Sequence, residues 1–504
     1  MYAPPGAAAP DVGDLEVVSD GDRLHLFHLT LPNHDVIQHA VSDDGLTWRP
    51  LPPALRTGEP GDADDDQVWT MSVVRDPARD RWVMLYTALS SADGGTVQRI
   101  GMATSRDLVR WQKSPANPVA APDPRWYEAD PAGWGSVSFR DPKTLRVGDR
   151  WHATFDAREA GGPFLRRGCV GLLVSDDLET WRVEPPLFAP RRFWDLEVPQ
   201  AFRLADDPAD PGSDTGPWAL TASVIEDRTQ RYWLADRFRG PWRTPPDGGI
   251  LAPRGHYAGR VTRWRGDLLL WCWHQPRLQD GWLSTPESVD WRPPRNPFGK
   301  HVAAPLALRP RPDGTLACHS FAGWDAYADG APAPLPAPAR TLFHDRPAAG
   351  PWHLAAPDGT DLLASDAAFG DVLAEGTLRL AAPVGGLGFR LDADGGGYFV
   401  EVRQRERLAL LLKWLPSPPP WLGGTVTRLR ELQRGPLPPG WAEGDALPFR
   451  LVVNGPSIEV SLAGEVVLAD ASGERAEGRL GIWADSGTVR AEGFRAAPMR
   501  RVGA

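Results

Sequence analysis

Short apolar runs recur along the first three fifths of the chain, and each is followed by a polar turn. The runs are rich in aromatic, β-branched and leucine residues, which is typical of buried strands bounded by turns. They occupy residues 24–29, 82–89, 151–155, 218–224 and 268–273. Each run therefore predicts a strand within one repeated β unit.

The turns share a signature of their own, Ser-x-Asp-x-x-x-Trp. Three complete copies end at Trp48, Trp111 and Trp181, and two degenerate copies end at Trp242 and Trp291. Five copies of one strand-and-turn unit predict a closed five-bladed β-propeller, because closure removes the exposed edges of the sheets. We expect these tryptophans to pack between blades rather than to bind a ligand.

The pattern changes after residue 327, where we expect the propeller domain (1–327) to end. Residues 328–343 are rich in Ala and Pro, a composition typical of a semi-rigid linker. Alternating apolar runs return in 344–504, and Asn454-Gly455 lies between two of them, which is a strong hairpin signal. We predict a β-sandwich for this last domain, and hence an all-β protein.

Charge and apolar content limit the partners. The 504 residues include 55 basic and 65 acidic side chains, a net charge of −10 without a basic stripe, so nucleic acid is not an expected partner. The longest apolar runs are far shorter than the roughly 20 residues that a bilayer requires, so no membrane contact is expected. The first ten residues lack the pattern of a signal peptide, and we expect a cytoplasmic protein.

Common cofactor and metal motifs are absent from the sequence. It contains no Walker A sequence, no HExxH, no complete GxGxxG and no GxSxG, and its histidines lack metal-ligand spacing. Three cysteines form no CxxC pair. We therefore predict neither a cofactor nor a catalytic metal.

The candidate chemistry lies on the innermost strand of each unit, expected near 14–18, 68–74, 136–141, 197–202 and 256–261. Three of these strands carry an isolated carboxylate: Asp14, Asp141 and Glu197. The other two carry Trp69 and the pair His256-Tyr257. Because the inner strands of a propeller line its central channel, we expect these side chains to meet at one mouth.

The first of these strands contains two aspartates, Asp11 and Asp14. They are three residues apart, so a continuous strand would point them to opposite faces. Val12-Gly13 favours a bend that would let the strand begin at Asp14. We expect Asp14 to face the channel and Asp11 to lie on the entering loop.

Three carboxyl groups at one mouth repel one another. Repulsion separates their pKa values and keeps at least one group protonated near neutral pH. A carboxylic acid beside a carboxylate is what cleavage of a glycosidic bond requires. Arg140 is expected to keep the adjacent Asp141 ionised or to bind a sugar hydroxyl. An aspartate before a proline also commonly starts a turn, so a structural role for Asp141 stays open.

Several of these stretches resemble glycoside hydrolase family 32, which includes invertases, levanases and fructan hydrolases, and more distantly families 68 and 43. Residues 25–28, 39–48 and 51–55 resemble the first blade of the family. Arg140-Asp141-Pro142 is similar to its Arg-Asp-Pro motif, and Glu197-Val198-Pro199 is similar to its Glu-Cys-Pro motif except at the cysteine. His256-Tyr257-Ala258 is similar to its aromatic-Tyr-Ala stretch.

The resemblance implies a retaining enzyme that cleaves β-fructofuranosides, with a small oligosaccharide or glycoside as the substrate. It implies Asp14 as the nucleophile, Asp141 as the stabiliser of the transition state, and Glu197 as the acid/base. The expected substrate-binding residues are Arg140, Trp69, His256 and Tyr257.

The chain departs from the family at two places. Residues 13–17 read Gly-Asp-Leu-Glu-Val where the family has Asn-Asp-Pro-Asn-Gly, and residues 69–72 read Trp-Thr-Met-Ser in place of a Ser-Gly-Ser-Ala type of stretch. Both departures suggest an altered substrate. Two alternatives therefore stay open: an inverting arabinofuranosidase- or xylosidase-like enzyme of family 43, and a carbohydrate-binding propeller without turnover.

Overall fold

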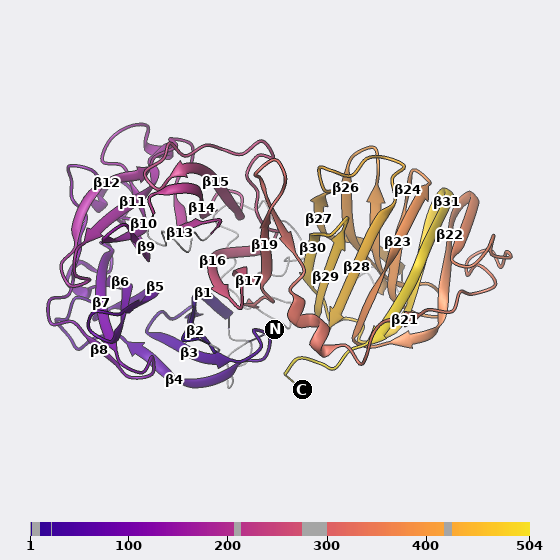
Figure 1. Cartoon of the computed structure of the whole chain (residues 1–504), viewed down its shortest axis with the longest axis horizontal. Helices are drawn as coiled ribbons and strands as arrows, with labels where there is room; N and C mark the ends of the chain where they lie inside the picture. Colours follow the sequence, from indigo (N-terminus) through magenta and orange to yellow (C-terminus); the bar gives the residue numbers. More distant parts are fainter. Residues whose placement is uncertain are drawn as a thin grey trace. The chain divides into compact units, whose positions relative to one another are not determined.

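The computed structural model describes residues 2, 11–21, 23–205, 213–274, 300–417 and 426–503. It divides into two compact units, Met1–Ala252 with His256–Leu316 and Pro253–Gly255 with Ala317–Ala504. The first unit is a five-bladed propeller and the second is built on one large sandwich-like sheet (Figure 1). The predicted all-β fold class is therefore confirmed.

The strands of the propeller follow one another blade by blade. The first blade contains β1 (Asp11–Ser19), β2 (Leu24–Leu31), β3 (Val36–Ser42) and β4 (Arg49–Arg56), and the second contains β5 (Gln67–Asp76), β6 (Arg81–Leu89), β7 (Arg99–Ser105) and β8 (Trp111–Lys113). The third contains β9 (Phe139–Val147), β10 (Arg150–Arg158), β11 (Gly168–Ser175) and β12 (Arg182–Phe188), and the fourth contains β13 (Leu196–Arg203), β14 (Thr215–Val224) and β15 (Thr229–Arg237). The fifth contains β16 (His256–Trp264), β17 (Asp267–His274), β18 (His301–Val302) and β19 (Leu306–Pro310), and β20 (Leu316–His319) carries the chain into the second unit.

The inner strands of the five blades form a closed ring. Each of β1, β5, β9, β13 and β16 contacts the next, and β16 contacts β1. All five lie where the sequence pattern predicted an inner strand, with shifts of a few residues at their ends. The ring surrounds the centre of the propeller in Figure 1.

The Ser-x-Asp turns stabilise the blades. In the first copy, Ser42 Oγ donates to Asp44 Oδ1 at 3.0 Å, and the same oxygen accepts the backbone N–H groups of Leu46 at 2.8 Å and Thr47 at 2.7 Å. The second and third copies repeat these bonds. The aspartate therefore satisfies backbone donors in a tight turn. The fifth copy, at Trp291, lies outside the described residues.

The tryptophans of this motif pack against the preceding blade, as predicted. Trp48 packs edge to face on Trp271 of the fifth blade, with ring centroids 5.7 Å apart. Trp111 packs in the same way on Phe27 of the first blade at 5.8 Å. Trp181 is buried in a cluster that includes residues of the second blade. These indoles therefore contribute to the core between blades.

Every inner strand contains a β-bulge near its start, where two residues oppose one residue of the next strand. The bulged pairs are residues 13–14, 69–70, 141–142, 198–199 and 258–259. Three bulge residues have left-handed backbone angles, with φ of 61° at Asp141, 52° at Val198 and 53° at Ala258. Bulges turn side chains away from the regular alternation. They lie at the same end of all five strands. The candidate residues other than His256 lie in the bulges or directly before them: Asp14, Trp69, Arg140, Asp141, Glu197 and Tyr257.

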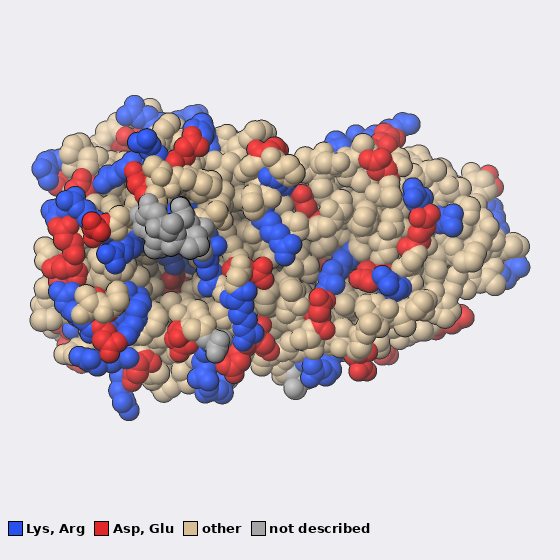
Figure 2. All heavy atoms as spheres, viewed as in Figure 1, with Lys and Arg blue, Asp and Glu red and all other residues tan. Residues whose placement is uncertain are grey.

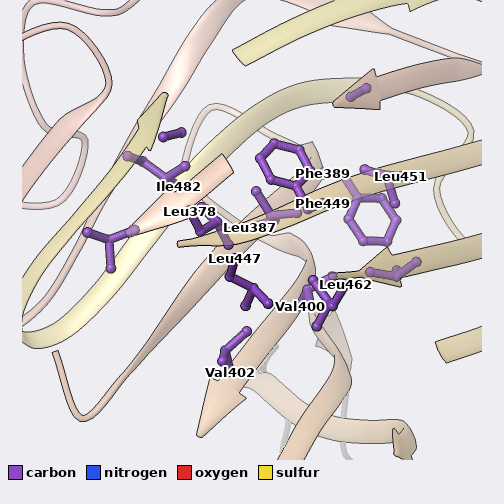
Figure 3. Close-up of a cluster of buried hydrophobic side chains, with 14 of the residues drawn as sticks. Leu378, Leu387, Phe389, Val400, Val402, Leu447, Phe449, Leu451, Leu462 and Ile482 are labelled. Carbon is purple, nitrogen blue, oxygen red and sulfur yellow. The ribbon is translucent and has the colours of Figure 1, made fainter. Parts of the chain in front are cut away.

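The second unit is a single antiparallel sheet with strand order β27-β26-β25-β24-β31-β23-β28-β29-β30, to which β21 and β22 add through β31. Its strands are β21 (Ala333–Pro334), β22 (His353–Phe369), β23 (Val372–Ala381), β24 (Val384–Leu391), β25 (Gly397–Arg403), β26 (Leu408–Ser417), β27 (Val426–Pro436), β28 (Leu447–Asn454), β29 (Ser457–Leu462), β30 (Glu465–Ala471) and β31 (Gly478–Pro498). Side chains from its inner face, among them Phe389, Phe449 and Ile482, form the core of the unit (Figure 3). The hairpin predicted at Asn454-Gly455 joins β28 to β29.

Residues 328–343 fold with the second unit, in contrast to the expected linker, and the two units divide after Leu316 rather than at residue 327. Ala333–Pro334 pairs with β31, and the buried Leu335 accepts a hydrogen bond from Trp352 Nε1 at 2.8 Å. An Ala/Pro-rich composition indicates a stiff chain, but it does not reveal whether a neighbouring sheet binds that chain.

Candidate active site

Asp14 lies in the bulge of β1, where side chains of two neighbouring blades hold its carboxylate. Its Oδ2 accepts a hydrogen bond from Thr70 Oγ1 of β5 at 2.6 Å, and its Oδ1 accepts one from Trp273 Nε1 of β17 at 3.0 Å. Asp11 instead accepts the backbone N–H of Lys300 at 2.8 Å. β1 already begins at Asp11, and its bulge, rather than a later start, separates the two aspartates.

Asp141 is buried in the bulge of β9. Its backbone N–H donates to Thr87 Oγ1 at 2.9 Å, and its Oδ2 accepts the backbone N–H of Val198 at 3.0 Å. Both Asp141 and Val198 have positive φ, which is unfavourable for residues other than glycine unless surrounding contacts stabilise it. The bulges of the third and fourth blades are therefore joined directly at this carboxylate.

Glu197 stands one residue before the bulge of β13 and is only partly buried. Its Oε1 accepts a hydrogen bond from Arg140 Nη2 at 3.0 Å, and its Oε2 accepts a short one from the Tyr257 hydroxyl. The guanidinium of Arg228 lies 5.0 Å from the centre of the Tyr257 ring. Both oxygens of Glu197 are thus engaged by groups from neighbouring blades.

Arg140 connects Glu197 to two further acidic side chains. Its Nη2 lies 2.8 Å from Asp156 Oδ2 and 3.0 Å from Asp195 Oδ2, and its Nε lies 3.6 Å from Asp141 Oδ2. The guanidinium is therefore committed to carboxyl groups of the protein. The binding of a sugar hydroxyl by Arg140 stays a prediction.

The carboxyl groups have separated pKa values. Burial raises the pKa of Asp141 to about 7, against the opposing effect of Arg140 and with help from the charges of Asp14 and Glu197. Burial acts in the same direction on Glu197, but Arg140 and Arg228 outweigh it and lower the pKa of that carboxyl below its usual range. The predicted protonated group near neutral pH is therefore Asp141 in this structure, and the expected role of Arg140 in keeping Asp141 ionised is outweighed by burial.

Two buried aspartates lie behind Glu197, and their pKa values are also raised. Burial raises the pKa of Asp156 well above its usual range, and it raises that of Asp195, in both cases against the attraction of Arg140. In both side chains burial disfavours the charged form of the carboxyl group. Such perturbed groups are common at catalytic sites.

Of the expected substrate-binding residues, Tyr257 contacts the carboxyl group of Glu197, whereas His256 packs elsewhere. His256 is buried and packs edge to face on His274, with centroids 5.1 Å apart. Neighbouring strand residues point to opposite faces, so it is directed away from Tyr257. Trp69 is partly buried; its Nε1 donates to Gln67 at 2.6 Å and its ring packs on His34 at 5.2 Å.

Four residues of this site were not identified from the sequence: Thr70, Arg228, Trp273 and Lys300. Lys300 Nζ lies 5.1 Å from the centre of the Trp273 ring, and burial lowers its pKa. Trp273 ends an apolar run and Arg228 lies in the turn between β14 and β15, so both resembled ordinary structural positions. A signal for Thr70 and Trp273 exists in the sequence: polar or aromatic residues at the end of a strand that faces the site, on the second strand of a blade as well as on the inner one.

Arg260 lies fully buried behind the bulges. Its guanidinium donates to the backbone oxygens of Pro142 at 2.9 Å, Pro199 at 3.1 Å and Asp141 at 3.4 Å. Its Nε lies 3.5 Å from Glu16 Oε2. Arg260 therefore connects two bulges, the one in β9 that carries Asp141 and the one in β13 that directly follows Glu197. It acts as a positioning residue.

The described ranges hold neither a metal-binding cluster nor a membrane-spanning helix. No group of three or more His, Cys, Asp or Glu side chains there is arranged to hold a metal ion. No helix in this part of the chain is long and apolar enough to cross a membrane. Acidic and basic side chains are interspersed on the face shown in Figure 2.

Comparison with known proteins identifies the family. The profile described as "Glycosyl hydrolases family 32 N-terminal domain" matches residues 17–275, about half of the chain. The chain belongs to glycosyl hydrolase family 32. The resemblance inferred from the Arg-Asp-Pro and Glu-x-Pro motifs is thus confirmed.

Curated relatives within family 32 match only part of their own length. A levanase of Bacillus sp. (strain L7) is 29% identical over 240 residues, which are 44% of this chain and 23% of the relative. A β-fructofuranosidase of Arabidopsis thaliana, insoluble isoenzyme CWINV5, is 32% identical over 242 residues, which are 45% of this chain and 40% of the relative. The matched segments thus span less than half of these relatives.

Solved structures extend the likeness in fold to nearly the whole family 32 chain. The exo-inulinase of Aspergillus awamori superposes with a TM-score of 0.70 at 18% identity, covering 99% of this chain and 97% of the other. Fructan 1-exohydrolase IIa of Cichorium intybus superposes with a TM-score of 0.67 at 15% identity, with the same coverage of both chains. At these identities the likeness concerns the fold.

Proposed function

We propose that this family 32 protein is a glycoside hydrolase that cleaves β-fructofuranosyl units from a small oligosaccharide or glycoside with retention of configuration. The observation that carries the proposal is that Asp14, Asp141 and Glu197 stand at the bulged ends of three inner strands and lie close enough for the charges of Asp14 and Glu197 to raise the pKa of Asp141. The names of its relatives, levanase and β-fructofuranosidase, support the substrate class. So does a structural neighbour, a fructan exohydrolase in complex with 1-kestose.

In the proposed first step, a carboxylate oxygen of Asp14 attacks the anomeric carbon and forms a bond to it. The bond from that carbon to the leaving oxygen breaks, and Glu197 gives its proton to this oxygen. Thr70 and Trp273 orient the attacking carboxylate through their hydrogen bonds. In the second step Glu197 takes a proton from water, and the water oxygen displaces Asp14 from the sugar.

The proton for the first step has to reach Glu197, whose pKa is lowered, in a site where Asp141 holds a proton up to about pH 7. Asp141 and Glu197 act on each other electrostatically. Interacting carboxyl groups titrate as a pair, so a fraction of the singly protonated site carries its proton on Glu197. Bound sugar excludes water from Glu197, and this desolvation favours its protonated form. In this proposal Asp141 hydrogen-bonds hydroxyl groups of the sugar as charge develops.

The first test is a substrate panel. Purified protein is incubated with sucrose, inulin, levan and aryl arabinofuranosides, and released sugars are separated by chromatography. Fructose release from the first three supports the proposal. Release of arabinose alone would favour an arabinofuranosidase-like activity, and no release from any compound would favour a binding propeller. NMR of the first-formed sugar then reports whether configuration is retained or inverted.

The second test assigns the acid. Glu197→Gln removes the proton donor and should slow turnover of sucrose by roughly 10²–10⁴-fold. An aryl fructoside with a good leaving group needs little protonation, so its loss should be clearly smaller. Equal losses on both substrates would remove the acid role from Glu197 while leaving the substrate assignment intact.

A further inference from the structure

An aromatic cluster with an unusually exposed indole borders the propeller site. It consists of Trp134, Phe164 and Trp194, called here the aromatic rim. Trp194 lies at its centre, with ring centroids 4.5 Å from Trp134 and 5.2 Å from Phe164. Trp134 is 60% exposed, although large aromatic side chains are usually mostly buried. This exposure leaves most of one indole accessible to a ligand.

The rim is held rigidly from beneath by Arg158, a fully buried arginine. Its guanidinium stacks on Trp194 at 3.6 Å from the ring centre and donates to the backbone oxygens of Trp194 at 2.9 Å and Phe164 at 2.6 Å. Glu128 accepts its Nε–H at 2.8 Å. A surface ordered before binding loses little conformational entropy when a ligand arrives.

The rim lies at the same end of the blades as the carboxyl groups. Trp134 and Trp194 occur just before β9 and β13, whose second residues are Arg140 and Glu197. β10 runs antiparallel to β9, with Ala157 opposite Phe139, so the loop that carries Phe164 leaves from that end as well. Three residues of chain span at most about 10 Å, which bounds the distance between the Cα atoms of Trp194 and Glu197.

We propose that the aromatic rim binds the part of an oligosaccharide that continues beyond the leaving sugar, that is, the second and later units past the cleaved bond. The inference rests on the proposed function and deepens it by assigning a preference for chains over disaccharides. The apolar C–H face of a sugar ring packs on the exposed indole of Trp134, while its hydroxyl groups remain in water. An exposed apolar surface continuous with a polar site is a common form of ligand groove.

The test compares Trp134→Ala with Trp126→Ala. Trp126 is a matched control because it precedes β9 in the same connection and is 38% exposed. The values of kcat and KM are measured for sucrose and for inulin-type chains of increasing length. Trp134→Ala should lower kcat/KM for the chains by roughly 2- to 10-fold, the range of an aromatic packing contact, mainly through KM. Sucrose should change by less than about twofold, and Trp126→Ala should affect neither substrate.

The outcomes separate this inference from the function on which it rests. If the wild-type protein releases no fructose from any substrate, the proposed function fails, whatever the variants do. If it does release fructose but Trp134→Ala affects sucrose and long chains equally, the chain-binding role of the rim is overturned. Light scattering adds a further check: a dimer that Trp134→Ala dissociates would assign the exposed indole to contact with a second copy, and this would also overturn the inference.

Discussion

Replacing Arg260 by methionine tests whether the buried cation behind the bulges sets the geometry of the site. The substitution keeps much of the apolar stem and removes the guanidinium. It leaves the backbone oxygens of Pro142, Pro199 and Asp141 without this donor. Glu16 keeps the ion pair with Lys143, so its carboxylate does not become an isolated charge.

The size of the expected destabilisation follows from this remaining ion pair of Glu16. Removing one member of a buried ion pair typically costs about 3–5 kcal/mol, and each hydrogen bond from a charged donor contributes roughly 1.5–3 kcal/mol. Burial lowers the pKa of Arg260, which shows that the folded protein already bears a cost for its charge. We therefore expect Arg260→Met to lower the free energy of unfolding by about 3 kcal/mol, the lower end of the range for breaking a buried ion pair. Turnover should fall by roughly 10²-fold, because a shift of about 1 Å in a catalytic group has that effect.

Two quantities are measured. Unfolding in guanidinium chloride is followed by tryptophan fluorescence, and kcat is determined on the best substrate of the panel. Arg263→Met is the control, since Arg263 lies on the same strand, is exposed, and donates to the backbone oxygen of Arg203 at 2.8 Å. It should change stability by less than about 1.5 kcal/mol. Arg260→Lys should recover part of both properties. The positioning role would be refuted if Arg260→Met had a free energy of unfolding within about 0.5 kcal/mol of wild type and a kcat within about twofold of it.

Four further predictions follow from the site and the core. Because the pKa of Asp141 is raised to about 7, its contribution to stability is present at about pH 4 and lost as the pH rises to 7. The free energy of unfolding of Asp141→Asn minus that of wild type, measured by chemical denaturation, should therefore grow more positive from pH 4 to pH 8, by at most about 4 kcal/mol. The value of kcat/KM should fall as the pH rises through about 7, because the pair formed by Asp141 and Glu197 then loses its proton. In Asp141→Asn this decline of kcat/KM should move to lower pH. Trp181→Ala should destabilise the protein by about 3–5 kcal/mol in chemical denaturation while preserving kcat of the folded fraction. Asp14→Asn should abolish turnover with an unchanged circular dichroism spectrum, whereas Asp11→Asn should retain most of the activity in the same assay.

Local pattern was sufficient for much of the fold. The apolar runs and the Ser-x-Asp turns depend on residues close together in the sequence, and the turn bonds of Ser42 and Asp44 lie within five residues of each other. The packing of Trp48 and Trp111 followed once the repeat was recognised as a propeller. The boundary between the units was harder, because residues near Leu335 are ordered by pairing with a strand more than a hundred residues later.

The site could be predicted only in part, for a similar reason. Asp14, Asp141 and Glu197 stood out as charges within apolar strands. Thr70, Trp273 and Arg260 did not, because each has a role only through a partner on another blade. His256 was expected beside Tyr257 from its position in the sequence, yet strand alternation directs it to the opposite face.

The bulges explain why these distant residues converge. A bulge is a property of pairing between two strands, so no single strand sequence reveals it, and the residues at the five bulges have little in common. The five bulges share their position: each bulge contains the residue whose side chain reaches the site or directly follows that residue. A one-residue deletion within 141–142 would restore regular pairing between β9 and β10 and would keep the later pairs, such as Lys143 with Thr154, in register. It would remove the left-handed turn at Asp141 that directs the carboxyl group into the site. The bulge therefore aims the carboxyl group without disturbing the pairing of the blade on either side of it.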